Sequence, residues 1–254
     1  MTTAFKDHFS GHADDYRTFR PLYPAALTAV LADAAPAHDL AWDVGCGNGQ
    51  LSGDLATRFA RIVATDASAK QVASAVPHER VEYRAAPAER SGLPDACADL
   101  IVAAQAAHWF DLPAFYAEVE RVARPGAALA LVSYGVLTAD GAVGALLRAF
   151  HDETLGRWWP PERHHVDDGY ASLPFPVPEL PVPALDMAMP WTLAQTVGYL
   201  GTWSAVKAAI KGTGSNPLDG FAETLAEAWG DAEATRIIRW PLAVRLGHIE
   251  KDKA

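Results

Sequence analysis

The sequence has little cysteine and no long apolar run, and each shortage excludes a class of protein. Cys46 and Cys97 are the only cysteines among 254 residues, which is too few for a disulfide framework or a zinc site of four thiolates. No stretch approaches the roughly 18 consecutive apolar residues of a membrane span. Residues 1–19 are polar and charged, without the apolar core of a secretion signal. We therefore expect a cytoplasmic protein without a membrane partner.

An excess of basic charge is also lacking. The chain has 21 lysines and arginines against 31 aspartates and glutamates, for a formal charge of −10 and a pI of about 5.3. Proteins that bind nucleic acid through its phosphates need a basic surface. We therefore expect a small-molecule substrate and no nucleic-acid partner, while the composition does not decide between a monomer and a homodimer.

Apolar runs alternate with helical patterns along the first half of the chain. The runs predict strands at 40–44, 62–65, 81–84, 100–104 and 127–134, and the segments between them predict helices at 50–59, 67–76 and 112–123. A further helix is expected at 24–34. Such alternation is typical of an α/β fold with a parallel sheet covered by helices, and ligands bind such sheets at the carboxyl ends of the strands.

The pattern changes after Gly135. Helices are expected at 143–155, 193–210 and 218–229, separated by a stretch that holds eight of the 18 prolines between Pro160 and Pro190. That density of proline excludes a continuous helix or a central strand there. Residues 236–245 predict a strand pair or one bent strand, and Pro241 indicates a sheet edge or a bulge.

A glycine turn follows the first predicted strand, in the stretch Asp43-Val44-Gly45-Cys46-Gly47-Asn48-Gly49-Gln50. Glycines permit positive φ and let a ligand approach bare backbone, and the helix that begins after them offers its N-terminal N–H groups. Asp66 ends the second strand, about 20 residues on, where a carboxylate suits ribose hydroxyls. A dinucleotide fingerprint would have its third glycine at Gln50, and a phosphate loop would need a Lys-Ser/Thr pair. The turn therefore predicts a nucleoside cofactor of another kind.

These motifs resemble those of class I S-adenosylmethionine-dependent methyltransferases. The resemblance rests on Asp43–Gly49 together with Asp66-Ala67-Ser68, Ala86-Pro87-Ala88-Glu89, Asp99-Leu100-Ile101-Val102, Gln105-Ala106-Ala107-His108-Trp109-Phe110-Asp111 and Arg121-Val122-Ala123-Arg124-Pro125-Gly126. The stretches Tyr16…Arg20-Pro21, His108-Trp109-Phe110, Thr202-Trp203-Ser204 and Trp240-Pro241-Leu242 are similar to the small-molecule branch that includes trans-aconitate methyltransferases.

The resemblance implies a fold and a cofactor site. The expected fold is a Rossmann-like parallel sheet flanked by helices, with an antiparallel C-terminal edge strand and a helical, proline-rich cap. The implied domains are an N-terminal arm and helix covering the cofactor (1–36), a cofactor-binding core (37–135), a cap with a late core strand (136–230) and a C-terminal strand and tail (231–254). The residues implied to bind S-adenosylmethionine, and its product S-adenosylhomocysteine, are Tyr16, Arg20, Asp43, Gly45, Cys46, Gly47, Gln50, Asp66, Ala67, Ala88, Glu89 and Gln105.

Individual roles follow from the same resemblance. Arg20 would pair with the methionine carboxylate, Asp43 would lie near the ammonium group, and Asp66 would bind the ribose. Many relatives carry an acidic residue where this chain has Pro87, so adenine contacts there would fall to backbone or to Glu89. Gln105 would close the site near the sulfonium.

The chemistry of the acceptor decides whether a base is needed. A carboxylate acceptor needs none, whereas a hydroxyl, amine or thiol benefits from one, and His108 is the candidate base or substrate contact. A structural role for His108, with its ring beside Trp109, is an equally open alternative. Trp109, Trp158 and Trp203 are candidates for the substrate pocket, although aromatic residues in a cap more often form core. The adjacent histidines His164-His165 lack the i, i+4 spacing of a metal site, and no metal is expected.

The sequence therefore predicts an enzyme that transfers a methyl group from S-adenosylmethionine to a small molecule, plausibly a carboxylate-bearing metabolite. Two alternatives stay open at this stage. One is a nicotinamide-dependent oxidoreductase, and the other is a non-catalytic protein that binds S-adenosylmethionine.

Overall fold

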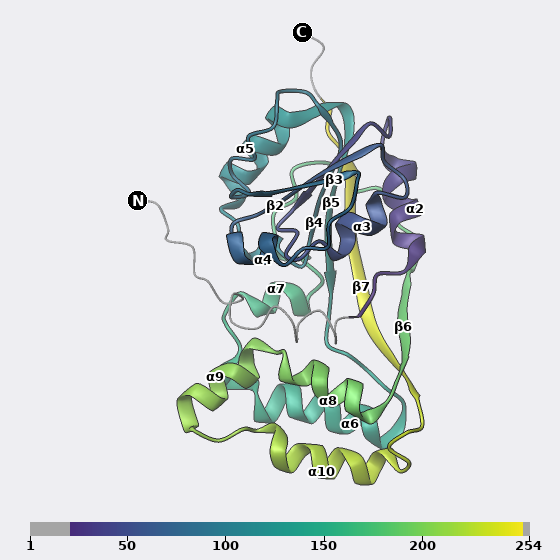
Figure 1. Ribbon diagram of the computed structural model, residues 1–254, viewed down its shortest axis with the longest axis vertical. Coiled ribbons are helices and arrows are strands. Elements are labelled where there is room, and N and C mark those ends of the chain that lie inside the picture. The colour runs from purple at the N-terminus through teal and green to yellow at the C-terminus, as the bar shows by residue number, and fades with distance from the viewer. Residues whose placement is uncertain (1–20, 251–254) are drawn as a thin grey trace.

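A computed structural model describes residues 21–250, so the roles predicted for Tyr16 and Arg20 fall outside the described residues. One seven-stranded sheet runs through them in the order β3-β2-β1-β4-β5-β7-β6 (Figure 1). Its strands are β1 (Leu40–Val44), β2 (Arg61–Asp66), β3 (Val81–Ala85), β4 (Ala98–Ala104), β5 (Ala123–Tyr134), β6 (Asp186–Trp191) and β7 (Arg236–His248). The Rossmann-like fold expected from the sequence is confirmed.

The central strands are parallel, and they are apolar because helices cover both of their faces. All five residues of β1 are buried, and Trp42 lies level with Val63 of β2 on one side and Ile101 of β4 on the other. The parallel order places the carboxyl ends of β1, β2, β4 and β5 at one edge, where the glycine turn begins.

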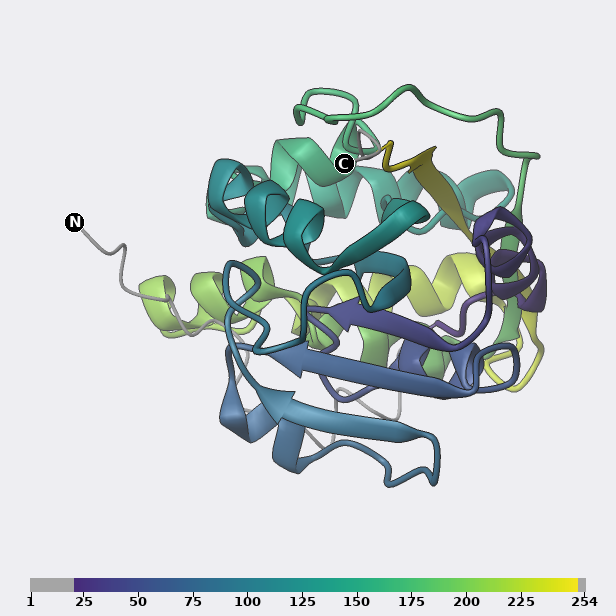
Figure 2. The same cartoon turned by 90° about the horizontal axis from the view of Figure 1, so that it is seen from above.

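Helices cover both faces of this sheet (Figure 2). Leu27 and Leu31 of α2 (Ala25–Ala34) and Leu55 of α3 (Gln50–Leu55) belong to the buried cluster on one face. Phe115 and Val119 of α5 (Leu112–Val122) belong to the cluster on the other face. The short helix α4 (Ala69–Ala73) follows β2, and the 3-10 turn η1 (Ala107–Trp109) follows β4. Both α3 and α4 are shorter than the sequence predicted.

The cap forms a second helical layer beyond the carboxyl edge of the sheet (Figure 1). It contains α6 (Gly141–Ala149), a π-helical turn η2 (Phe150–Thr154), η3 (Gly156–Trp158), α8 (Leu193–Gly201), α9 (Ser204–Thr213) and α10 (Leu218–Trp229), while α7 (Arg163–Asp167) lies between cap and sheet. The single helix predicted at 193–210 is wrong. It is two helices, because the chain leaves helical geometry at Trp203, whose φ of −64° and ψ of 135° are extended.

The C-terminal strand is antiparallel, as expected, and one long strand serves two partners. Residues 242–248 of β7 pair with β5, and residues 236–241 pair with β6. Pro241 lies where one pairing ends and the other begins, which suits a residue that cannot donate a backbone hydrogen bond. Strand β6 lies inside the proline-rich stretch, at the edge of the sheet. The resemblance implied a late core strand within 136–230, but the proline content did not show where that strand lies.

Candidate functional site: the carboxyl edge of the sheet

The glycine turn is fixed against the end of β2 by its backbone. The N–H groups of Gly45 and Cys46 both donate to the carbonyl oxygen of Thr65, at 2.7 and 3.0 Å. Gly45 has a φ of +67°, and a Cβ atom there would lie 2.4 Å from the Cβ of Ala106. No residue with a side chain fits that position, because both the backbone conformation and the neighbouring atom forbid it.

Gly47, in contrast to Gly45, has open space where a side chain would lie. Its φ is +56°, but a Cβ atom there would meet nothing within 4 Å. Its N–H donates to Oδ2 of Asp66 at 2.9 Å, and Oδ1 of Asp66 accepts from the N–H of Ser68 at 2.8 Å. The carboxylate of Asp66 therefore stands beside open space at the glycine backbone, and carboxylate oxygens accept hydrogen bonds from hydroxyl donors.

A buried acid lies beneath the turn. Asp43 is 1% exposed and accepts a hydrogen bond from Oγ of Ser52 in α3 at 2.6 Å. Burial, opposed by the bond from Ser52 and reinforced by the charge of Asp66, raises the pKa of Asp43 to about 7. A buried carboxyl group with a pKa near 7 ionises when a cation lies next to it, and the resulting carboxylate stabilises that cation. Burial also raises the pKa of the Cys46 thiol, so that group is no nucleophile.

Gln105 carries an unsatisfied polar atom at the end of β4. Its φ of +56° is rare for a residue with a side chain. Its side-chain Nε2 donates to the carbonyl of Tyr134 at 2.9 Å, while its Oε1 is buried without a hydrogen-bond partner among residues 21–250. Strained backbone and an unpaired buried oxygen at one residue are typical of a ligand site.

Four other predicted cofactor residues lie around this edge. Nε2 of Gln50 donates to the carbonyl of Pro21, so its amide holds the segment that precedes α2. Oε1 of Glu89 accepts from the N–H of Asp111 at 3.0 Å, which ties the β3–β4 connection to the start of α5. Ala67 is exposed and Ala88 is buried. The structure therefore assigns supporting contacts to Gln50 and Glu89, and their direct roles toward the cofactor stay predictions.

His108 is held by a buried phenol. Its Nδ1 lies 2.8 Å from the hydroxyl of Tyr170, and its ring lies 4.7 Å from that of Trp109. Burial lowers the pKa of His108 to about 3, and the charges of Arg163 and His165 act in the same direction. With a pKa this low, His108 binds a proton weakly and is poorly suited to act as a base at neutral pH.

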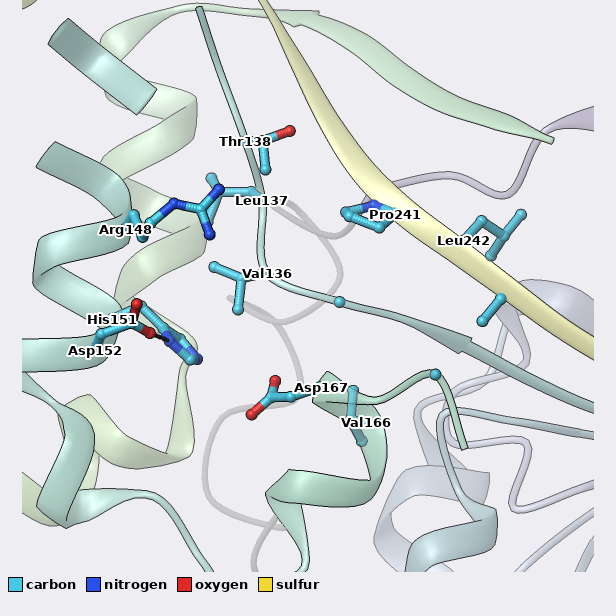
Figure 3. A pocket seen from close by; sticks show the side chains of 13 residues that line it. Val136, Leu137, Thr138, Arg148, His151, Asp152, Val166, Asp167, Pro241 and Leu242 are labelled. Atoms are coloured by element: carbon cyan, nitrogen blue, oxygen red, sulfur yellow. Dashed lines mark hydrogen bonds and ion pairs between the residues drawn. The ribbon is translucent and has the colours of Figure 1, made fainter. Parts of the chain in front are cut away.

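A cavity of about 370 Å³ lies between the end of β5 and the cap (Figure 3). It is not centred on the glycine turn. Its lining includes Gly135, which follows the partner of Gln105 in sequence, and Gly169, which precedes the partner of His108. Its charged and titratable lining comes from Arg148, His151, Asp152 and Asp167. The sequence analysis named none of these four residues.

Two tryptophans that the sequence predicted for the substrate pocket, Trp158 and Trp203, pack elsewhere in the cap. Trp158 packs against Gly212 of α9, with the guanidinium of Arg157 4.8 Å from its ring centre. Trp203 is buried against Trp159, with ring centres 5.3 Å apart. Neither is among the residues that line the cavity.

Metal ligands and membrane spans are absent from residues 21–250. No group of three or more His, Cys, Asp or Glu side chains there gathers closely enough to hold a metal ion. The same residues contain no helix with the length and apolar character to cross a membrane.

Comparison with known proteins agrees with this geometry. The sequence profile of the methyltransferase domain matches residues 42–131. A protein of Dictyostelium discoideum classed as a methyltransferase is 33% identical over 231 residues, which cover 89% of this chain and 88% of that protein. A solved structure from Anaeromyxobacter dehalogenans, described as a type II methyltransferase, is 48% identical, has a TM-score of 0.87 and matches 92% of this chain and 100% of its own. The malonyl-[acyl-carrier protein] O-methyltransferase of Dechloromonas aromatica is 40% identical over 115 residues, but only 44% of this chain and 42% of that protein are covered.

The fold and the edge of the sheet define a nucleoside-binding α/β enzyme with a glycine turn and a strand-end carboxylate. Together with the comparisons, they show that the chain belongs to the class I S-adenosylmethionine-dependent methyltransferases. Membership in this family removes the nicotinamide-dependent and non-catalytic alternatives.

The residues present fit the cofactor. Gly47 leaves open space beside backbone, Asp66 offers carboxylate oxygens, and Oε1 of Gln105 has no partner among the described residues. S-adenosylmethionine supplies an activated methyl group on sulfur when it is bound. The turn and Gln105 would contribute orientation, since alignment of the reacting atoms is the main contribution a protein makes to such a transfer.

Proposed function

We propose that this methyltransferase acts on a small molecule that carries a carboxylate, bound in the cavity between β5 and the cap. The observation that carries the proposal is the pairing of charges in that cavity. Asp152 is bonded to His151 at 2.6 Å and Asp167 to Arg163 at 2.9 Å. Arg148, which projects from α6 toward Val136 and Leu137 (Figure 3), has no ion pair or hydrogen bond with any of residues 21–250.

An unpaired guanidinium in a cavity wall suits a planar anion, because its parallel N–H groups match the two oxygens of a carboxylate. The apolar part of the cavity comes from Val136, Leu137, Val166 and Leu242, which suits a short carbon chain. The similarity to trans-aconitate methyltransferases in the sequence motifs points to the same acceptor class, and it stays a prediction.

The test is methyl transfer from labelled S-adenosylmethionine to a library of small carboxylic acids and their uncharged amides. We expect the wild-type enzyme to prefer the acids. Arg148→Ala should raise the KM for an acid acceptor by about 10- to 100-fold, the effect of losing a charged hydrogen bond worth about 1.5–3 kcal/mol, while the dissociation constant for S-adenosylmethionine stays unchanged.

Arg157→Ala is the matched control, since it also removes one positive charge from the cap but at a side chain stacked on Trp158 outside the cavity. A preference for the amides, or an equal effect of both variants on KM, would refute the proposal.

A further inference from the structure

The cavity wall contains a second histidine, in an unusual backbone setting. At Phe150 helix α6 widens into the π-helical turn η2, where the N–H of Leu155 donates to the carbonyl of Phe150 at 3.0 Å, five residues away. Such turns are rare and occur frequently at functional sites. Here the turn carries His151 and Asp152 on the side of the cavity that faces Pro241 and Leu242 (Figure 3).

The ring of His151 is fixed and only one of its nitrogens is used. His151 is 6% exposed, and its ring lies 4.8 Å from that of Trp159 and 5.7 Å from that of Trp203. Nδ1 lies 2.6 Å from Oδ1 of Asp152. Nε2 is buried and has no hydrogen-bond partner among residues 21–250. Buried polar atoms are nearly always paired, so an unpaired nitrogen in a cavity wall points to a ligand.

The partner of His151 sets its tautomer. The carboxylate of Asp152 can only accept, so Nδ1 of His151 carries the proton and Nε2 keeps a bare lone pair. At His108 the partner of Nδ1 is the hydroxyl of Tyr170, which can donate or accept and so fixes no tautomer. His151 therefore lines the cavity with a proton acceptor that no described residue occupies.

We infer that His151 is the general base of the transfer, that Asp152 is its positioning residue, and that the methylated atom of the acceptor is a hydroxyl oxygen. The inference rests on the proposed function and names its substrate class, a hydroxy acid. A carboxylate needs no base, a neutral amine attacks before it loses its proton, and a thiol ionises readily near pH 8.5. A hydroxyl stays protonated at neutral pH and is the acceptor that most needs a base.

The step balances within the cavity. As the hydroxyl oxygen bonds to the methyl carbon, the carbon–sulfur bond breaks and its electron pair remains on sulfur, which becomes a neutral thioether. The hydroxyl proton passes to Nε2 of His151. The resulting imidazolium is stabilised by the carboxylate of Asp152, as in other histidine–aspartate pairs.

Burial and several charged groups shift the pKa of His151. Burial and the charge of Arg163 on α7 lower the pKa of His151. Its hydrogen bond to Asp152 and the charge of Asp167 on α7 raise that pKa. Arg148 on α6 lines the same cavity. The ring is therefore neutral at pH 7, which is the state a base requires.

Nitrogen-15 spectroscopy of the histidine-labelled protein tests the tautomer without any acceptor. The signal of His151 is assigned as the one of nine histidines that disappears in His151→Gln. We expect its Nδ1 to carry the proton and its Nε2 to be bare at pH 7. A proton on Nε2 of His151 at pH 7 would overturn the inference.

The second test is methyl transfer to pairs of acids that differ only by a hydroxyl. We expect transfer to the hydroxy acid, a fall in kcat of about 100-fold or more in His151→Gln and an unchanged dissociation constant for S-adenosylmethionine. Asp152→Asn, at an exposed carboxylate that places no demand on folding, should lower kcat and shift the acidic limb of kcat/KM to lower pH. Glu153→Gln removes the same charge one residue along and should do neither.

Failure of the inference and failure of the proposed function are distinguishable. Transfer to the acids without a hydroxyl, with His151→Gln as active as wild type, overturns the inference and leaves the proposed function intact. Transfer only to uncharged hydroxyl compounds, with the expected loss in His151→Gln, overturns the carboxylate preference and retains His151 as the base.

Discussion

The glycine turn and the cap wall of the cavity, which is formed by Arg148, His151 and Asp152, are built from different groups. In the turn, backbone N–H groups make most of the polar contacts, and those of Gly45, Cys46 and Gly47 all have partners. In the cap wall the polar groups are side chains, and Arg148 and Nε2 of His151 have no partner among residues 21–250. A site made of backbone can be changed only by distorting the chain, whereas a site made of side chains can change its ligand by substitution. Variants of the turn should therefore lose stability together with cofactor binding, while variants of the wall should lose activity alone.

The largest effect is expected for Gly45→Ala. Its added Cβ would lie 2.4 Å from the Cβ of Ala106, at a φ of +67°, so the unfolding free energy should fall by about 3–5 kcal/mol from strain and overpacking. Gly47→Ala is the matched control, since its Cβ meets no protein atom within 4 Å. It should cost only about 1 kcal/mol of stability and still abolish binding of S-adenosylmethionine. Denaturant unfolding and calorimetry measure the two quantities, and equal stability losses would show that the turn is not braced as described.

A smaller effect is expected from Asp43→Asn, and it depends on pH. The native pKa of Asp43, about 7 instead of 3.8, means that the folded state binds the proton more tightly than the unfolded state. The unfolding free energy of the wild type should therefore fall as pH rises from about 4 to 7, by an amount on the order of 4 kcal/mol, and then level off. The variant should lack this slope and bind the cofactor more weakly. Parallel curves for the two proteins would contradict a buried, raised carboxyl group.

The smallest effect is expected from Gln50→Ala. If the amide of Gln50 serves the carbonyl of Pro21 and not the cofactor, its loss should cost about 1 kcal/mol of stability, the value of one hydrogen bond. The dissociation constant for S-adenosylmethionine should stay within about threefold of the wild type. A tenfold weaker affinity without a change in stability would return Gln50 to the group of cofactor ligands that the sequence predicted.

The fold was predictable where a pattern of apolar and turn-forming residues repeats along the chain. Each of β1 to β5 is an apolar run followed by a turn, so periodicity located all five strands. The position of strand β6 was not located because its pairing with β7 is set by a segment some 50 residues away and its sequence contains Pro190. The break before α9 was missed because no proline marks it, although Gly201 at the end of α8 was an available stop signal.

The site divides in the same way. Gly45, Gly47 and Asp66 could be predicted as site residues because spacing along the chain reflects the geometry of one turn. Arg148 and His151 could not, because the roles proposed for them depend on the cavity that β5, β7 and α7 close around them. One signal was available, the i, i+3 spacing of Arg148 and His151 on one face of a predicted helix, but it carries no meaning until the facing elements are known.

The double pairing of β7 also bears on how the protein is made. Residues 128–134 of β5 meet their β7 partners more than 100 positions later in the chain, and Pro241, Leu242 and Ala243 of β7 form part of the cavity wall. During synthesis the glycine turn and the parallel strands can form while β7 is still inside the ribosome, since their contacts are closer in sequence. We therefore expect a nascent chain to acquire its cofactor turn well before its acceptor cavity.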